Sequence, residues 1–182
     1  SWKSYAMGTS VTQQAKAGSF EYDYYPTTYT ITYDLAGGTH SGNPTTYNVL
    51  YGVTFKNPTR KGYTFSGWYI DGKKVTGINP GATASFTSAS DMYSKLASRT
   101  TGNKTVTAKW TPIKYQISYD GNGATGGSTP NTSLTYDKPG TVAENGYIWE
   151  SHVFVEWNTK PDGSGTSYKP GDKVTNLTDK DG

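Results

Sequence analysis

The chain contains no cysteine among its 182 residues. This absence excludes a disulfide framework and a zinc site built from thiolates, and it leaves the redox compartment open. No apolar run approaches the roughly 20 residues that a membrane-spanning helix needs, so we expect no membrane insertion. The first residues, Ser1-Trp2-Lys3, do not resemble a signal peptide. We therefore expect the chain to be a segment excised from a longer protein.

The chain also has little excess of positive over negative charge. The formal net charge is +3, and the basic residues occur singly or in pairs such as Arg60-Lys61 and Lys73-Lys74. A nucleic-acid interface needs basic side chains concentrated on one surface. The sequence therefore predicts no nucleic-acid partner, and we interpret these charges as a solvated face.

Aliphatic side chains are too few to build a core alone. Only 32% of the residues are hydrophobic, and these include 16 Tyr, 5 Trp and 5 Phe. Each aromatic side chain can bury about 150–250 Å², so a small core can be built mainly from aromatics. The 22 glycines, together with abundant Thr, Ser and Asn, favour short strands and turns. The composition predicts an all-β protein or a β-rich α+β protein.

Residues 62–72 (GYTFSGWYIDG) are the best-defined motif. Aromatic side chains alternate at Tyr63 and Phe65, Trp68 follows a glycine, and the motif ends at Asp71-Gly72, a pair typical of a two-residue hairpin turn. The same Phe-x-x-Trp kernel returns within residues 153–158 (VFVEWN). The chain is therefore predicted to be a repeat protein.

A second repeated pattern predicts the unit boundaries. The spacing Tyr24-x-Pro26-x-x-Tyr29 matches that of residues 110–115, which read WTPIKY. Proline cannot continue a central β-ladder, which fits a short, stiff junction between units. We predict that residues 1–26 end a preceding unit or form a linker strand. Residues 27–112 would be a first complete repeat, and residues 113–182 a second repeat that lacks its closing strand.

Period-2 patterns predict the elements of each repeat. The first repeat has strand patterns at 28–35, 46–55, 63–70 and 105–110. One short helix is predicted at 88–97, where Ser or Asp can cap its start and Met92 and Leu96 lie one turn apart. The second repeat has strand patterns at 115–120, 132–136 and 152–157.

The order of these motifs resembles the Listeria-Bacteroides repeat, the internalin-type B repeat of bacterial surface proteins. The resemblance rests on 29–38, 62–69 and 106–110 in the first repeat and on 115–123 in the second, whereas 152–157 departs from the pattern. It implies tandem small β-grasp-like units, each a twisted sheet crossed by a short helix, and thus a β-rich α+β class. It implies no shared catalytic residues.

The resemblance also implies a function and a location. Such repeats occur on secreted or wall-attached bacterial proteins, so the chain is predicted to be a non-catalytic spacer, or stalk, and an adhesion module on the cell surface or cell wall. Its partner would be an unknown protein or a cell-surface glycan. The alternative is a carbohydrate-binding module that uses exposed Tyr and Trp side chains, because 14% of the residues are aromatic.

No catalytic, cofactor or metal site is predicted. The glycines of residues 121–127 lead into a strand pattern and not into the helix that a phosphate site requires. His40 and His152 occupy unlike positions and are interpreted as structural or surface residues. Asp162 and Asp172 lack the acidic spacing of an EF-hand, so we assign them to turns. The 14 acidic residues offer no motif that selects a catalytic pair, and we expect no enzyme.

The aromatic residues divide into two predicted groups. Those that recur between repeats, or that lie on predicted core strands, are assigned to the structural core, because repeated units must bury a face to be stable. The others are candidates for contact with a partner. The predicted core residues are Tyr63, Phe65, Trp68, Trp110, Phe154 and Trp157, and the candidate contact residues are Tyr24, Tyr25, Tyr93, Tyr147 and Trp149.

The second repeat has no counterpart of the strand at 106–110. We expect an open sheet edge there, and open edges favour pairing with another strand. One hypothesis is head-to-tail self-association, in which Phe20, Tyr22 and Tyr24 in strand 18–25 of another copy fill the edge. The alternative is that residues beyond 182 supply the strand and that residues 1–26 belong to a preceding unit.

Overall fold

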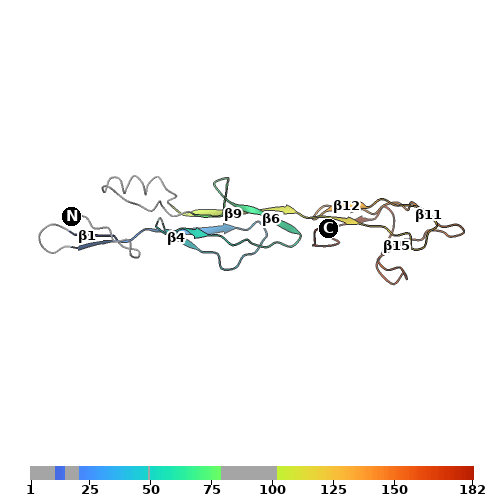
Figure 1. Cartoon of the computed structure of the whole chain (residues 1–182), viewed down its shortest axis with the longest axis horizontal. Helices are drawn as coiled ribbons and strands as arrows, with labels where there is room; N and C mark the ends of the chain where they lie inside the picture. The colour runs from blue at the N-terminus through green and yellow to red at the C-terminus, as the bar shows by residue number, and fades with distance from the viewer. Residues whose placement is uncertain (1–10, 15–20, 49, 79–101) are drawn as a thin grey trace. The chain divides into compact units, whose positions relative to one another are not determined.

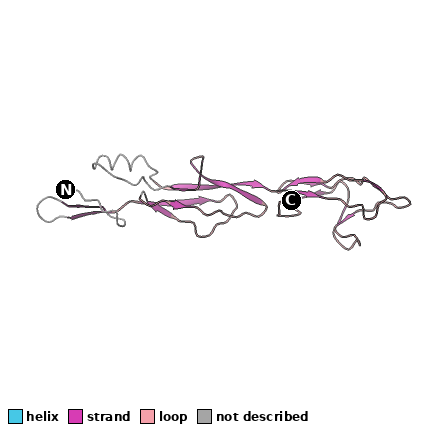
Figure 2. Cartoon of the chain, in the orientation of Figure 1, coloured by secondary structure: helices cyan, strands magenta, loops and turns pink. Residues whose placement is uncertain are grey.

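The computed structural model describes residues 11–14, 21–48, 50–78 and 102–182. The described residues form strands, turns and loops with no helix, arranged in several small sheets (Figure 2). The predicted β-rich α+β class is therefore wrong, because the part of the chain that the structure describes is all-β. The predicted helix at 88–97 lies outside the described residues. Two compact units divide the chain, and each is described by itself below.

Unit 1 comprises Ser1–Pro58 and Phe65–Lys109. Its main sheet has five strands in the order β4-β3-β9-β6-β7, so β9 lies between β3 and β6 (Figure 1). β3 pairs with β4 antiparallel and with β9 parallel, with Ile31 opposite Lys104 and Tyr33 opposite Val106. The five strands are β3 (Thr28–Asp34), β4 (Thr46–Asn48), β6 (Tyr63–Ile70), β7 (Lys73–Val75) and β9 (Lys104–Pro112).

The hairpin between β6 and β7 forms at the predicted turn. Ile70 pairs with Lys73, so Asp71 and Gly72 are the two loop residues. Their φ angles are +48° and +75°. Two successive positive φ values are the signature of a type I′ turn, whose twist matches that of the flanking strands. The Asp-Gly pair therefore sets the register that brings Trp68 opposite Val75.

Trp68 is the centre of the core of unit 1. Its side chain is 2% exposed, and its indole Nε1 donates to the Lys56 carbonyl at 3.1 Å. The rings of Tyr33, Phe55 and Phe65 surround it at centroid distances of 5.6, 6.0 and 5.3 Å. These edge-to-face contacts add to the apolar area that each ring buries. Burial raises the pKa of Tyr33 to about 12.

Two shorter pairs complete the described part of unit 1. The predicted strand at 46–55 is broken, because only β4 and β5 (Val53–Thr54) form there, and β5 pairs with β8 (Gly77–Ile78). Near the N-terminus, β1 (Val11–Gln14) pairs antiparallel with β2 (Glu21–Tyr24). Within the predicted strand 18–25, which the self-association hypothesis uses to fill the edge of another copy, residues 21–24 thus already have a partner strand along one edge.

Unit 2 comprises Thr59–Thr64 and Trp110–Gly182. It contains no large sheet among its described strands, which pair only two by two. The pairs are β10 (Lys114–Ile117) with β12 (Thr132–Thr135), β11 (Gly126–Gly127) with β14 (Tyr147–Ile148), β13 (Gly140–Thr141) with β17 (Lys173–Val174), and β15 (Trp157–Asn158) with β16 (Ser167–Tyr168).

Frequent turns explain the short strands of unit 2. Residues with positive φ interrupt the chain repeatedly, and they include Asn122, Asp137, Ser151 and Asn176, which are not glycines. Asn and Asp tolerate this conformation because their side chains bond to nearby backbone. The predicted strand at 152–157 therefore forms only at its end, as β15, and the predicted strand at 115–120 ends at Ile117.

A small apolar cluster holds unit 2 together. Tyr115 from β10, Leu134 from β12, Val142 and Val174 are buried against one another. Four half-buried residues pack around this cluster: Ile117, Tyr119, Trp157 and Tyr168. The cluster brings three of the two-stranded pairs together, β10–β12, β13–β17 and β15–β16. A single two-stranded pair is at best marginally stable in water by itself.

The last residues of the chain lie beside β10. The Gly182 amide donates to the Lys114 carbonyl at 3.2 Å, and the Gly182 carbonyl accepts from the Gln116 amide at 3.2 Å. Asp181 accepts from the Lys114 amide through its carboxylate. One residue that bonds to both neighbours of the residue opposite it is the pattern of a parallel β-ladder. The edge of β10 that was expected to be open is thus occupied at Tyr115.

Candidate functional site

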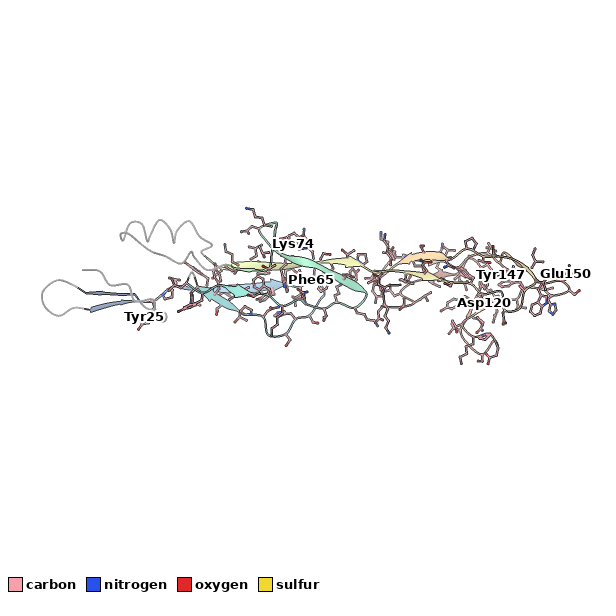
Figure 3. All side chains as sticks on the ribbon, in the orientation of Figure 1. Tyr25, Phe65, Lys74, Asp120, Tyr147 and Glu150 are labelled. Atoms are coloured by element: carbon pink, nitrogen blue, oxygen red, sulfur yellow. The ribbon has the colours of Figure 1, made fainter. Side chains whose placement is uncertain are left out.

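A groove of about 1130 Å³ opens on unit 2. The end of β10, the turn after it and the segment 147–157 form its walls. We call this site the unit 2 groove. Figure 3 shows two of its lining residues, Asp120 and Tyr147, on these walls. Its apolar and aromatic lining includes Ile117, Tyr119, Tyr147, Ile148, Trp149, Val153, Phe154, Val155 and Trp157.

Trp157 anchors the aromatic floor of the groove. Its indole Nε1 donates to the Ala143 carbonyl at 2.9 Å, and its ring lies 4.6 Å from the ring of Tyr119 and 5.0 Å from that of Phe154. The Tyr147 hydroxyl donates to the Tyr119 carbonyl at 2.7 Å. Because each ring has a hydrogen bond or a ring contact, this floor presents a fixed surface.

Trp149 forms the more exposed wall. Its side chain is 42% exposed, and its ring stacks on His152 with centroids 4.2 Å apart and an interplanar angle of 20°. A tight turn produces this stack, because the His152 amide donates to the Trp149 carbonyl and Ser151 has a φ of +63°. A Cβ on Gly123 would come within 3.4 Å of the Trp149 ring, so the glycine loop packs close to the indole.

Acidic side chains stand at the rim, and each is engaged locally. Asp120 accepts from the Asn122 amide at 2.7 Å, which is the geometry of an Asx turn. Glu156 accepts from the Ser167 hydroxyl and from Asn158. With Lys160, these are the carboxylate and ammonium groups that line the groove. The lining therefore carries one excess negative charge when His152 is neutral.

The two aspartates considered as calcium ligands both stabilise turns. Asp162 accepts from the Ser164 amide at 3.0 Å and from its hydroxyl at 2.8 Å. These bonds, led by that from the amide, lower the pKa of Asp162. Asp172 accepts from the Lys169 amide at 2.7 Å. Each carboxylate thus closes a loop of its own.

The candidate contact residues do not form one site. Tyr147 and Trp149 both line the unit 2 groove. Tyr24, at the end of β2, and the exposed Tyr25 belong to unit 1. Tyr93 lies outside the described residues.

The predicted core residues also have different environments. Trp68 is fully buried, and four of the others are half-buried: Tyr63, Phe65, Trp110 and Trp157. Phe154 is the most exposed of the six, with 37% of its surface accessible to solvent. The residues before Trp157 form no strand, so no neighbouring strand covers Phe154 from the solvent side. It contacts Trp157 and lines the groove instead.

Sequence analysis missed several groove residues. His152 was assigned a structural or surface role, yet its ring stacks on Trp149. Val153 and Val155 are 88% and 79% exposed, and Ile148 is exposed as well. A usable signal was present, because four of the seven residues from Tyr147 to Val153 are aromatic or β-branched and apolar. The turn at Glu150 and Ser151 interrupts this run. Only Tyr147 and Ile148 of this run belong to a strand, so no sheet is available to bury the remaining residues.

A polar cluster occupies another face of unit 2. The Tyr63 hydroxyl donates to Asp137 at 2.6 Å, and Asn176 bonds to the other carboxylate oxygen at 2.7 Å. The bond from Tyr63, followed by that from Asn176, lowers the pKa of Asp137. The same bond raises the pKa of Tyr63. The Arg60 guanidinium lies 3.7 Å from the centre of the Tyr63 ring, and Tyr136 packs against its edge.

Comparison with known proteins identifies relatives in one bacterium. Residues 29–95 and 115–180 match the model of the Listeria-Bacteroides repeat domain. A "Putative membrane protein" of Evansella cellulosilytica is 33% identical over 154 residues, which cover 79% of this chain and 20% of that protein. A "Putative Gly-rich membrane protein" of the same organism is 28% identical over 163 residues, covering 85% of this chain and 18% of that protein.

These matches fix the family but cover only a part of each relative. The chain spans about a fifth of the length of the two relatives. No solved structure gives a significant match. Within the described residues, no helix has the length and apolar character needed to cross a membrane. The two family matches together cover more than half of the sequence. The chain therefore belongs to the Listeria-Bacteroides repeat domain family and carries two copies of the repeat.

Proposed function

We propose that the chain is a non-catalytic repeat region of a bacterial cell-surface protein, where it acts as a spacer and as an interaction module. The observation that carries this proposal is the pair of family repeats within a segment that spans about a fifth of its relatives. Repeated units can add length between other domains while each unit keeps its own core. The relatives' names support an envelope location.

Accessibility on intact cells tests the location. The chain is expressed within its parent protein, and an antibody against the chain is applied to intact and to permeabilised cells. We expect equal labelling of both, and loss of the epitope when intact cells are treated with protease. Labelling that requires permeabilisation would contradict the proposal. A cytoplasmic marker protein, which must resist the protease, serves as the control.

A second candidate function is carbohydrate binding, and the exposure of Trp149 favours it. An indole that is 42% exposed beside a fixed aromatic floor is suited to stacking on a sugar ring. A glycan array compares the chain with Trp149→Ala and with Tyr25→Ala, which removes an exposed aromatic from unit 1. Binding that is lost only in Trp149→Ala would support this candidate, and absence of binding to any glycan would remove it.

A further inference from the structure

Two asparagines of this chain are followed directly by glycine, Asn122 and Asn145, and both lie in unit 2. In an Asn-Gly pair, the backbone nitrogen of the glycine can attack the side-chain carbonyl carbon of the asparagine, because glycine has no Cβ that obstructs the approach. The attack requires a peptide group that can rotate toward the side chain. The two pairs differ in how firmly this peptide group is held.

Asn122 and Gly123 form the tip of the turn that follows β10. Both residues are exposed, and their φ angles are +46° and +94°. The Asn122 amide donates to the Asp120 carboxylate at 2.7 Å, but the Gly123 amide makes no hydrogen bond with any residue that the structure describes. The atoms nearest to a Cβ built on Gly123 belong to the Trp149 side chain and not to backbone. The peptide group that joins Asn122 to Gly123 is therefore free to reorient.

Asn145 and Gly146 have the opposite environment. The Gly146 amide donates to the hydroxyl of Thr129 at 2.9 Å, and Thr129 is 6% exposed. The Gly146 carbonyl accepts from the Ser128 amide at 3.1 Å. Both polar atoms of the Asn145 carboxamide bond to the backbone of Tyr147, each at 3.0 Å. The attacking nitrogen and the side chain that it would attack are thus both fixed.

The exposure of the turn at Asn122 is shared by its counterpart in unit 1. In the turn after β3, Ala36 and Gly37 have φ angles of +46° and +86°, and the Ala36 amide donates to the Asp34 carboxylate at 3.1 Å. Ala36 and Gly37 are exposed although β9 pairs with β3 as far as Asp34. A strand beside the sheet therefore leaves this turn in contact with water. Unit 1 has alanine at the position of Asn122 and serves as a natural control.

We propose that Asn122 is a site of spontaneous deamidation, in which water is the co-reactant and no enzyme takes part. The Gly123 nitrogen loses its proton to solvent and forms a bond to the side-chain carbon Cγ of Asn122. The bond from Cγ to Nδ2 breaks, and this nitrogen takes a proton from solvent and leaves as ammonia. Water then adds to one of the two carbonyl carbons of the succinimide ring and opens it. The product is an aspartate or, when the other ring bond breaks, an isoaspartate.

Deamidation removes a contact between the turn and a neighbouring loop. The Asn122 carboxamide nitrogen donates to the Pro161 carbonyl at 2.9 Å, which links the turn to the loop between β15 and β16. A carboxylate has no hydrogen to donate to this carbonyl. It also adds a negative charge beside Asp120, and an isoaspartate lengthens the main chain by one carbon atom. Modification of Asn122 should therefore release residues 159–163 from the turn.

Peptide mapping of the folded chain over time tests the proposal. The purified chain is incubated in mildly alkaline buffer, and its proteolytic fragments are analysed by mass spectrometry at intervals. Replacement of the side-chain NH2 group by OH raises the fragment mass and locates the modified asparagine. We expect conversion at Asn122 to be at least about tenfold faster than at Asn145, because the bond from Gly146 to Thr129 must break before attack.

The unfolded chain shows whether this difference comes from the structure. In guanidinium chloride the hydrogen bonds of Gly146 and Asn145 are lost. Each asparagine then has only its sequence neighbours, and glycine follows both. We therefore expect Asn122 and Asn145 to convert at similar rates in the unfolded chain.

Two variants provide matched controls. Asn122→Ala copies the residue of unit 1 and should abolish conversion at this turn without changing the rate at Asn145. Thr129→Val removes the hydroxyl that accepts from Gly146 and should speed conversion at Asn145 about fivefold without changing the rate at Asn122. Circular dichroism checks that both variants fold. If Thr129→Val fails to fold, the comparison between the folded and unfolded chain decides.

NMR tests the consequence for the loop. As conversion proceeds, the amide signals of residues 159–163 should shift, whereas those of unit 1 should stay unchanged. The same spectra of Asn122→Ala, which also lacks the donor to Pro161, should show the loop signals already displaced. Unchanged loop signals in the fully converted chain would overturn the predicted release.

Three further results would overturn the proposal. The first is an Asn122 that remains unmodified in the folded chain after a time in which the unfolded chain is fully converted at this residue. The second is equal conversion of Asn122 and Asn145 in the folded chain. The third is the same ratio of the two rates in the folded and the unfolded chain, because the difference would then come from the sequence neighbours alone.

Discussion

Unit 1 and unit 2 carry the same Phe-x-x-Trp kernel, yet the two tryptophans have different environments. Trp68 is fully buried within a five-stranded sheet, whereas Trp157 is half-buried at the floor of an open groove. Both indoles donate to a carbonyl, at Lys56 and at Ala143. The hydrogen bond of the kernel is therefore present in both units, whereas full burial of the tryptophan is found only in unit 1. The same kernel is thus compatible with a closed core in a five-stranded sheet and with an open groove beside a two-stranded pair.

The largest expected effect tests this difference directly. Trp68→Ala should lower the free energy of unfolding of unit 1 by about 3–5 kcal/mol, because it empties a packed site and removes one of the two side-chain hydrogen bonds that the Lys56 carbonyl accepts. Trp157→Ala should cost unit 2 less, about 2 kcal/mol, since its side chain is only half-buried. Urea titrations followed by NMR signals from each unit measure both values.

Two phenylalanines, one in each unit, test the same difference in burial with a second residue type. Phe55→Ala, which removes a buried ring beside Trp68, should destabilise unit 1 about as strongly as other core truncations. Phe154→Ala should cost about 1 kcal/mol or less, because Phe154 is 37% exposed. Equal costs at Trp68 and Trp157 would mean that the groove of unit 2 is closed in solution, and the comparison between the units would fail.

The sequence was most informative where local chemistry decides the structure. The Asp71-Gly72 turn could be predicted because a two-residue hairpin with two positive φ values restricts the residues that fit. The strand patterns at β3, β6 and β9 could be found because their side chains alternate on a sheet that does form. The family follows from these motifs, since two copies of the repeat domain match.

The parts that could not be predicted depend on distant partners. Phe154 was assigned to the core because it aligns with Phe65, but burial requires a strand beside it. The same reasoning put a strand at 152–157, where backbone pairing begins only at Trp157. At the candidate site, Tyr147 and Trp149 were identified from their lack of repeat counterparts. His152 was not, because ring stacking on Trp149 arises from the turn at Ser151.

Two glycines with the same backbone angle give a smaller and sharper comparison. Gly62, in unit 2, and Gly72, in unit 1, both have a φ of +75°. A Cβ on Gly72 would meet no atom within 4 Å, whereas a Cβ on Gly62 would come within 2.2 Å of the Tyr136 ring. Gly72→Ala should therefore cost about 1 kcal/mol from backbone strain alone. Gly62→Ala should cost about 1–3 kcal/mol more, because Tyr136 must move.

Thermal unfolding, followed by signals from each unit, measures the cost of Gly62→Ala and of Gly72→Ala. Tyr136→Ala provides the control, because it removes the ring that the new Cβ would meet. In that background Gly62→Ala should cost about as much as Gly72→Ala. If the extra cost at Gly62 persisted without the ring, the strain would have a source other than Tyr136.

The smallest expected effect is a pH dependence confined to unit 2. Bonds from Tyr63 and Asn176 lower the pKa of Asp137, so its ionised form binds these partners better in the folded unit than in the unfolded chain. A lowered pKa in the folded state means that this stabilisation is fully present above the ordinary pKa of an aspartate and is lost as the pH falls through the folded value. The opposite holds for Tyr63, whose raised pKa makes its contribution disappear as the pH rises through the folded value.

The variant Asp137→Asn separates the pH dependence that comes from this cluster from that of the other acidic groups. The amide keeps the shape of the side chain but does not titrate, so the melting temperature of unit 2 should fall less steeply between pH 5 and pH 2 in the variant. Unit 1 has no counterpart of this cluster among its described residues. Its melting temperature should therefore show the same pH dependence in the unmodified chain and in Asp137→Asn. The positive charge of Arg60 also lowers the pKa of Asp137. Arg60→Gln should therefore weaken the acid dependence of unit 2 without abolishing it. Parallel acid profiles for the unmodified chain and Asp137→Asn would show that the bond from Tyr63 does not persist in solution, because a persistent bond to the carboxylate must appear as proton linkage.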